Sequence, residues 1–170
     1  MQFLQTNLSG TFLINFEKKS DTRGFFLRTF CTKEFKKNAL EYNFVQDSSS
    51  YTEKKGTIRG MHYQQAPDEE IKLIQCVQGS IYDVIIDLRK DSPTYKGWFS
   101  TILSPEKNNA LYVPKGFAHG FQTLTDNTMV NYKISTSFSL RNATGIRWDD
   151  PTIKIEWPLP LSIISDKDNQ

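Results

Sequence analysis

Short, regularly spaced strands are the feature that most limits the fold of this chain. From Phe44 onward, apolar and β-branched residues form short runs, and turn residues such as Ser104-Pro105 and Asp126-Asn127 separate them about every ten residues. We expect strands at residues 72–77, 80–88, 98–103, 111–113, 117–124 and 128–134. Many short strands at this spacing are typical of a sandwich or barrel. The pattern therefore predicts an all-β fold, a double-sheet jelly roll.

The first 40 residues predict strands followed by one short helix. The expected strands are at residues 3–8, 11–16 and 25–30. Thr32 can cap the N-terminus of a helix with its hydroxyl group. Phe35, Ala39 and Leu40 would then form an apolar stripe along it. No other stretch of the chain indicates a helix as clearly.

Three further local patterns predict a hairpin, one face of the core and the course of the C-terminal tail. Gln78-Gly79 predicts a tight hairpin between the strands at 72–77 and 80–88. In the second of these strands one face is apolar, and we expect it in the core: Tyr82, Val84, Ile86 and Leu88. Residues 157–160 alternate apolar residues with proline, so this tail is expected to wrap around the barrel without joining a sheet.

Composition excludes several classes of protein. With 38% hydrophobic and 13% aromatic residues, a chain of 170 residues can bury a real core, and we expect residues 1–170 to form a single domain. The 21 basic and 19 acidic residues are scattered, so no nucleic-acid surface is expected. The two cysteines form no CxxC pair, and no basic leader or long apolar run is present. We therefore expect a cytoplasmic protein without membrane contact.

Polar side chains on apolar faces indicate a ligand cavity. The chain has two histidines, His62 and His119, and imidazole is the side chain best suited to proton transfer near neutral pH. By the alternation of strands, His119 shares a face with apolar residues, as do Tyr132, Lys72 and, beside Ile58, His62. Such groups cost several kcal/mol when buried without partners. A ligand cavity accounts for them, and an ordinary buried polar network is the alternative.

A metal site is not expected. The string Pro114-x-Gly116-x-x-His119 looks like the second motif of the cupins. Cupin metal sites usually take an H-x-H pair from the first motif, and here that motif reads His62-Tyr63-Gln64. A ligand pair broken in this way argues against a tight transition-metal site, and thus against an oxygenase.

Taken together, the motifs resemble those of one family. In chain order they are Arg23-Gly24-Phe25-Phe26, Ile58-Arg59-Gly60-Met61-His62-Tyr63-Gln64, Lys72-Leu73, Asp83-Val84, Asp87-Leu88-Arg89, Ser92-Pro93-Thr94, Pro114-x-Gly116-Phe117-Ala118-His119-Gly120-Phe121, Tyr132-Lys133, Trp148-Asp149-Asp150-Pro151 and Trp157-Pro158. From about Ser20 to Asp168 the chain resembles the dTDP-4-dehydrorhamnose 3,5-epimerase family. The resemblance implies a cupin-type jelly roll that forms a homodimer, in which N-terminal strands add to the partner's sheet. It also implies a reaction without metal or cofactor on a nucleotide-linked 4-keto sugar.

The resemblance also implies roles for individual residues. His62 matches the general base and Asp168 the carboxylate that orients it. Tyr132 matches the acid on the opposite face of the sugar, and Lys72 the cation beside the ketone oxygen. The positions that match substrate or nucleotide contacts are Arg23, Phe26, Arg28, Gln46, Ser48, Arg59, His119, Phe138 and Lys167.

Some of these positions depart from the family's pattern. Arg28 and Ala143 stand where the family usually has glutamate, and Ser48 stands in its Q-D-N-x-S stretch. Phe138 replaces a tyrosine. These departures leave open which nucleotide is bound and whether C3, C5 or both carbons are inverted. We therefore expect an epimerase of deoxysugar or surface-glycan biosynthesis, with a cupin ketoisomerase and a non-catalytic sugar-binding cupin as alternatives.

Overall fold

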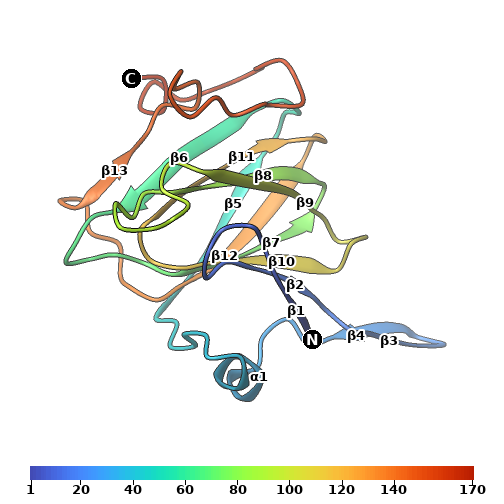
Figure 1. Cartoon of the computed structure of the whole chain (residues 1–170). Helices are drawn as coiled ribbons and strands as arrows, with labels where there is room; N and C mark the ends of the chain where they lie inside the picture. The colour runs from blue at the N-terminus through green and yellow to red at the C-terminus, as the bar shows by residue number, and fades with distance from the viewer.

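Two antiparallel sheets make up most of the protein. The computed structural model describes residues 1–170 and contains thirteen strands and one helix (Figure 1). The six-stranded sheet consists, in spatial order, of β1 (Gln2–Gln5), β2 (Phe12–Asn15), β10 (Asn109–Val113), β7 (Lys72–Gln78), β12 (Thr128–Ile134) and β5 (Gln46–Thr52). The five-stranded sheet consists of β13 (Ala143–Gly145), β6 (Ile58–Gln64), β11 (Phe117–Thr123), β8 (Ile81–Asp87) and β9 (Trp98–Leu103). The protein is a cupin-type jelly roll, as expected.

The main core lies between these sheets. Side chains on one face of each strand meet there because successive residues of a strand point to opposite sides. Ile74 and Val130 come from the six-stranded sheet, while Ile85 and Phe121 come from the five-stranded sheet, and all four are almost fully buried. Each such side chain contributes about 1.5–3 kcal/mol when it leaves water. The alternation of the strands therefore holds the sheets together.

The strand predictions are largely confirmed. β9 and β12 cover the predicted residues 98–103 and 128–134, and β1 and β2 pair with each other around the Ser9-Gly10 turn. A separate two-stranded hairpin, β3 (Lys18–Asp21) with β4 (Gly24–Leu27), projects from the barrel (Figure 1).

The predicted hairpin at Gln78-Gly79 is wrong. β7 pairs with β10 and β12, whereas β8 pairs with β11 and β9 in the other sheet. The turn therefore carries the chain from one sheet to the other. Gly79 has φ 74°, and an added Cβ would lie 2.6 Å from the hydroxyl oxygens of Thr125 and Thr128, so glycine is needed there. A turn of this kind has the same local sequence signal as a hairpin.

The helix forms, but with different ends. α1 spans Thr32–Lys37, its N-cap is Cys31, and no side chain caps it, so the predicted cap at Thr32 is wrong. Ala39 and Leu40 lie beyond its end. Phe35 is fully buried against Tyr112 and Leu40 in a second cluster on the outer face of the six-stranded sheet, and this packing holds the helix. With six residues, this helix is far too short to span a membrane.

The tail at residues 157–160 joins no sheet, as predicted, and the C-terminal segment packs on the outer face of the five-stranded sheet. Val84 and Ile86 are buried there under Ile153, with Trp157 packed beside them, so the predicted apolar face of β8 lies in this outer core. The chain then runs back along β6, where the Ile58 amide donates to the carbonyl oxygen of Ile163 at 3.0 Å. This return brings the last residues next to β6.

Candidate active site

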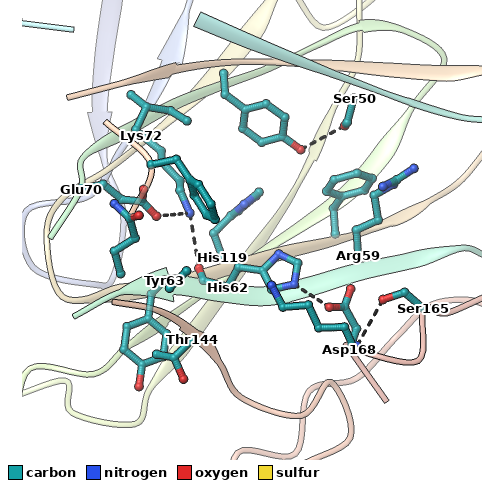
Figure 2. Close-up of a pocket in the computed structure, with 17 residues that line it drawn as sticks. Ser50, Arg59, His62, Tyr63, Glu70, Lys72, His119, Thr144, Ser165 and Asp168 are labelled. Atoms are coloured by element: carbon teal, nitrogen blue, oxygen red, sulfur yellow. Dashed lines mark hydrogen bonds and ion pairs between the residues drawn. The ribbon is translucent and has the colours of Figure 1, made fainter. Parts of the chain in front are cut away.

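A cavity of about 390 Å³ opens between the two sheets, and the C-terminal turn forms part of its wall (Figure 2). All four predicted catalytic residues line it: His62, Lys72, Tyr132 and Asp168. Four predicted binding residues do so as well: Arg59, His119, Phe138 and Lys167. These residues come from β6, β7, β11, β12 and the loops near the chain's end, so the tertiary fold assembles the site.

His62 and Asp168 form a directly bonded pair. The Nε2 atom of His62 lies 2.6 Å from Oδ1 of Asp168, and Oδ2 of Asp168 accepts the Gly60 amide at 3.1 Å. The Asp168 side chain is only 7% exposed, while that of His62 is 43% exposed. A carboxylate accepts a hydrogen bond from Nε2–H, which leaves Nδ1 of His62 as the nitrogen able to take a proton. The pair is therefore arranged as an oriented base.

An irregularity in β6 turns His62 into the cavity. His62 lies opposite His119 in β11, but Arg59 lies opposite Phe121 and Ile58 opposite Gln122, so the register shifts between them. The prediction that His62 shares a face with Ile58 is therefore wrong. The irregularity surrounds Gly60, whose φ is 130° and where a Cβ would lie 2.5 Å from the Cα of Gly120.

Lys72 lies across the cavity, at the start of β7. Its ammonium group is 2.8 Å from Oε1 of Glu70 and donates to the backbone oxygen of His62 at 3.4 Å (Figure 2). Both charged side chains are only 11% exposed. Sequence reasoning missed Glu70, which lies just before β7 and therefore outside the strand pattern.

Tyr132 faces the cavity from β12. Its hydroxyl lies 3.3 Å from Oγ of Ser50, a second cavity residue that sequence reasoning missed. Burial raises the pKa of Tyr132 well above its usual range, because a phenolate would lose its hydration there. Tyr132 therefore keeps its proton at neutral pH and can donate it to a ligand.

His119 has a carboxylate partner of its own. Its Nε2 atom lies 2.7 Å from Oδ1 of Asp83, which is fully buried, and its ring meets that of Tyr132 edge to face at 6.0 Å. The other Asp83 oxygen has no partner, and burial raises the pKa of this carboxyl. His119 is thus a rigid wall of the cavity, held by Asp83 from behind.

The Nε2 atom of each histidine thus pairs with one carboxylate, that of Asp168 for His62 and that of Asp83 for His119. No group of three or more His, Cys, Asp or Glu side chains is placed to hold a metal ion. That catalysis needs no metal remains a prediction, which chelation can test.

Arg23, Phe26 and Arg28 do not reach this cavity within one chain. They belong to the β3–β4 hairpin and its end, where Arg23 pairs with Asp21 at 2.6 Å and its side chain is 87% exposed. Phe26 is 64% exposed. Arg28 lies 3.4 Å from Glu34 of α1. The hairpin projects away from the barrel (Figure 1).

The rim of the cavity lies near β5. Gln46 accepts the amide of Phe138 at 3.1 Å and donates to the Ser48 hydroxyl at 3.1 Å. Phe138 is 60% exposed at the rim, and Ala143 of β13 lines the cavity. Gln46 and Ser48 therefore shape the rim through Phe138 and are not themselves among the lining residues.

Cationic groups stand at the cavity wall. The Arg59 guanidinium is tied to β5 through Thr52 Oγ1, at 2.9 Å from Nε, and to the carbonyl oxygen of Tyr51 at 3.0 Å. Lys167 lies in the C-terminal turn next to Asp168. Cationic side chains at a cavity wall suit phosphate groups.

Comparison with known proteins gives one consistent result. Residues 5–170 match the family model described as dTDP-4-dehydrorhamnose 3,5-epimerase. The chain is 41% identical over 170 residues to the dTDP-4-dehydrorhamnose 3,5-epimerase of Sinorhizobium fredii, covering 99% of this chain and 87% of that protein. The crystal structure of the Bacillus anthracis epimerase with TDP and PPi bound is 45% identical, with a TM-score of 0.95 over 98% of this chain and 95% of that one. A 4-keto-6-deoxy sugar epimerase from Streptomyces spheroides is 30% identical, with a TM-score of 0.94 over 99% and 84%.

Proposed function

Because the chain belongs to the dTDP-4-dehydrorhamnose 3,5-epimerase family, we propose that its cavity inverts C3, C5 or both carbons of a nucleotide-linked 4-keto sugar. The protein is an isomerase of deoxysugar biosynthesis. One observation carries the assignment of the cavity: an oriented base and a partly buried phenol face it from opposite sheets. His62 is on β6 of the five-stranded sheet, and Tyr132 is on β12 of the six-stranded sheet.

The first step is removal of a proton next to the ketone. Nδ1 of His62 takes the proton from carbon, while Asp168 stabilises the imidazolium that forms. The electron pair of the C–H bond moves to the ketone oxygen and gives an enolate. The Lys72 ammonium lies in the same cavity and can stabilise this negative charge, an effect typically worth about 10²–10³ in rate.

The second step returns a proton to the other face of the sugar ring. Donation from His62 restores the substrate, because the proton returns to the face that it left. Tyr132 stands on the opposite sheet and holds its proton, so donation from its hydroxyl inverts the carbon. Before the next turnover the Tyr132 phenolate must recover a proton, and the His62 imidazolium must release to solvent the one that it took from carbon.

The nucleotide end of the substrate fits the cationic wall. Arg59 and Lys167 provide positive charges for a diphosphate, and their arrangement supports binding of a nucleoside diphosphate. His119, held by Asp83, and Phe138 at the rim complete the proposed contacts within one chain.

We also propose that residues 1–170 form one domain and that two copies associate as a homodimer. The β3–β4 hairpin exposes Phe25 by 59% and Phe26 by 64%, and β5 has one unpaired edge beside the cavity. Exposed aromatic residues and open strand edges favour association. If the hairpin of one copy packs against the other copy, it would bring Arg23, Phe26 and Arg28 towards the cavity of that other copy. We also propose that the enzyme is cytoplasmic, where free cysteines such as Cys31 and Cys76 stay reduced.

Incubation with a dTDP-linked 4-keto-6-deoxy sugar in D₂O tests the epimerase function. We expect deuterium at C3, C5 or both, together with an inverted product, by NMR spectroscopy. No exchange on any 4-keto sugar nucleotide would leave the non-catalytic sugar-binding alternative. A product whose ketone has moved would identify a ketoisomerase.

Complementation between variants tests the dimer. Mixed His62→Ala and Arg23→Glu subunits should recover part of the activity that each variant lacks alone, because one cavity of the mixed dimer has both residues intact. A monomer in analytical ultracentrifugation, with no recovery on mixing, would contradict the proposal.

A further inference from the structure

Glu70 and Lys72 form an ion pair inside the cavity. Oε1 of Glu70 lies 2.8 Å from Nζ of Lys72, and each side chain is 11% exposed. Figure 2 shows the Glu70 carboxylate beside the Lys72 ammonium at one side of the cavity. Charged side chains are seldom so well buried without a partner. Since the pair faces the reaction site, its charge and geometry bear directly on the reaction.

The ammonium is held by one ion pair and one hydrogen bond. A lysine ammonium carries three N–H groups. One donates to the backbone oxygen of His62 at 3.4 Å, while the Glu70 carboxylate attracts the charged nitrogen from 2.8 Å. These two contacts fix the place of Nζ at one side of the cavity. No other acceptor within the protein is hydrogen-bonded to Nζ, so the ammonium keeps N–H groups for a ligand in the cavity.

Without Glu70, this geometry would be lost. Lysine holds its charge on a flexible four-carbon stem, and only the long bond to His62 would then hold the ammonium. Catalysis by charge stabilisation depends on donors that are already in place when negative charge develops. Displacement of a reacting or stabilising group by about 1 Å can cost about 10² in rate.

We propose that Glu70 is a positioning residue that orients the Lys72 ammonium towards the ketone oxygen of the substrate. The inference rests on the proposed function, because it assigns Lys72 to the developing enolate. Glu70 does not itself take part in proton transfer to or from carbon. Its carboxylate fixes the place of the Lys72 nitrogen in the cavity by charge attraction.

Two substitutions test this placement. Glu70→Leu removes the charge and the polar group together, whereas Glu70→Gln removes the charge and keeps a polar side chain of the same size. We expect Glu70→Leu to lower kcat for deuterium wash-in about 10- to 100-fold with little change in KM, since the loss concerns the transition state. Glu70→Gln should retain more of the rate. Glu69→Gln is the matched control: it removes the same charge one residue away, contacts neither Lys72 nor the cavity, and should keep wild-type kcat.

A double-mutant cycle with Lys72→Met shows whether Glu70 acts through the lysine. In the Lys72→Met background, Glu70→Leu should lower kcat no further, and thermal unfolding of the same four proteins should reveal coupling between the residues. An equal loss of kcat in both backgrounds, or a Glu70→Leu variant with wild-type kcat, would overturn the inference while leaving the epimerase function intact. If the wild-type protein exchanged no deuterium into any 4-keto sugar, the proposed function itself would be overturned. The unfolding measurements would then still test the ion pair, because additive effects of Glu70→Leu and Lys72→Met would refute it.

Discussion

Tyr132→Phe should separate proton exchange from inversion. The substitution removes only the hydroxyl oxygen and its 3.3 Å contact with Ser50. The aromatic ring, which packs against the main core between the sheets, stays in place. Loss of one hydrogen bond of this kind costs about 0.5–1.5 kcal/mol. The variant should therefore fold and retain its cavity, which makes its kinetics interpretable.

The expected loss of inversion rate follows from the positions of His62 and Tyr132 on opposite sheets. His62 and Lys72 remain, so the enolate still forms and deuterium still enters from the side of His62. Inversion needs a donor on the opposite sheet, and the nearest hydroxyl there is that of Ser50, a far weaker acid than a phenol. Loss of a general acid typically costs about 10²–10⁴ in rate. We expect inversion to fall by at least about 10², while wash-in falls by less than about tenfold.

The assay is NMR spectroscopy of sugar recovered from D₂O, which reports deuterium content and configuration together. His62→Ala should show neither exchange nor inversion. Tyr82→Phe is a matched control, because Tyr82 also bonds to a serine, accepting from Ser100 Oγ at 2.7 Å, but on the outer face of the five-stranded sheet. It should behave as wild type. Inversion by Tyr132→Phe at near the wild-type rate would refute the assignment of the acid.

Further outcomes are expected. Asp168→Asn should lower kcat by about 10² or more in steady-state assays, because an amide cannot stabilise the imidazolium of His62; unchanged kcat would remove Asp168 from the mechanism. Exhaustive chelation should leave turnover intact, and loss restored by one divalent ion would contradict the metal-free reaction. Arg28→Glu should change the ranking of nucleoside diphosphates in competition binding, since it replaces a donor with an acceptor; an unchanged ranking would make Arg28 a surface residue. Arg89 holds the pKa of buried Asp87 below its usual range, so the stability this carboxylate provides is present above about pH 4 and is lost as the pH falls. Asp87→Asn should therefore destabilise the protein more at about pH 6 than at about pH 3 in thermal unfolding, and an equal effect at both would refute the linkage.

Local sequence patterns were sufficient for the elements themselves. Alternating apolar residues located β9 and β12 at their observed ends, because burial of one strand face is a property of period two and needs no knowledge of the partner strand. The proline-rich tail was likewise recognisable as a segment outside the sheets. Ordered motifs, read as a resemblance, indicated the jelly roll and the four proposed catalytic residues, which the fold brings into one cavity.

The local sequence patterns did not show which strands are neighbours in the sheets. Gln78-Gly79 has the signal of a hairpin, yet β7 and β8 belong to different sheets, because strand partners are chosen by contacts between residues distant in the chain. Strict alternation also put His62 on the face of Ile58, whereas the irregularity at Gly60 reverses the face that follows. Thr32 does not cap α1, because burial of Phe35 places the helix without a side-chain cap.

Sequence patterns are enough to show which segments are strands, which faces are apolar, and which residue types are available for proton transfer. The folded chain brings these residues together: Asp168 reaches His62 because the C-terminal segment returns along β6, and Tyr132 faces them because it belongs to the other sheet. Glu70 and Ser50 became visible only as neighbours of Lys72 and Tyr132. A strand pattern reports burial, which is local, whereas an active site depends on distances between side chains that are far apart along the chain.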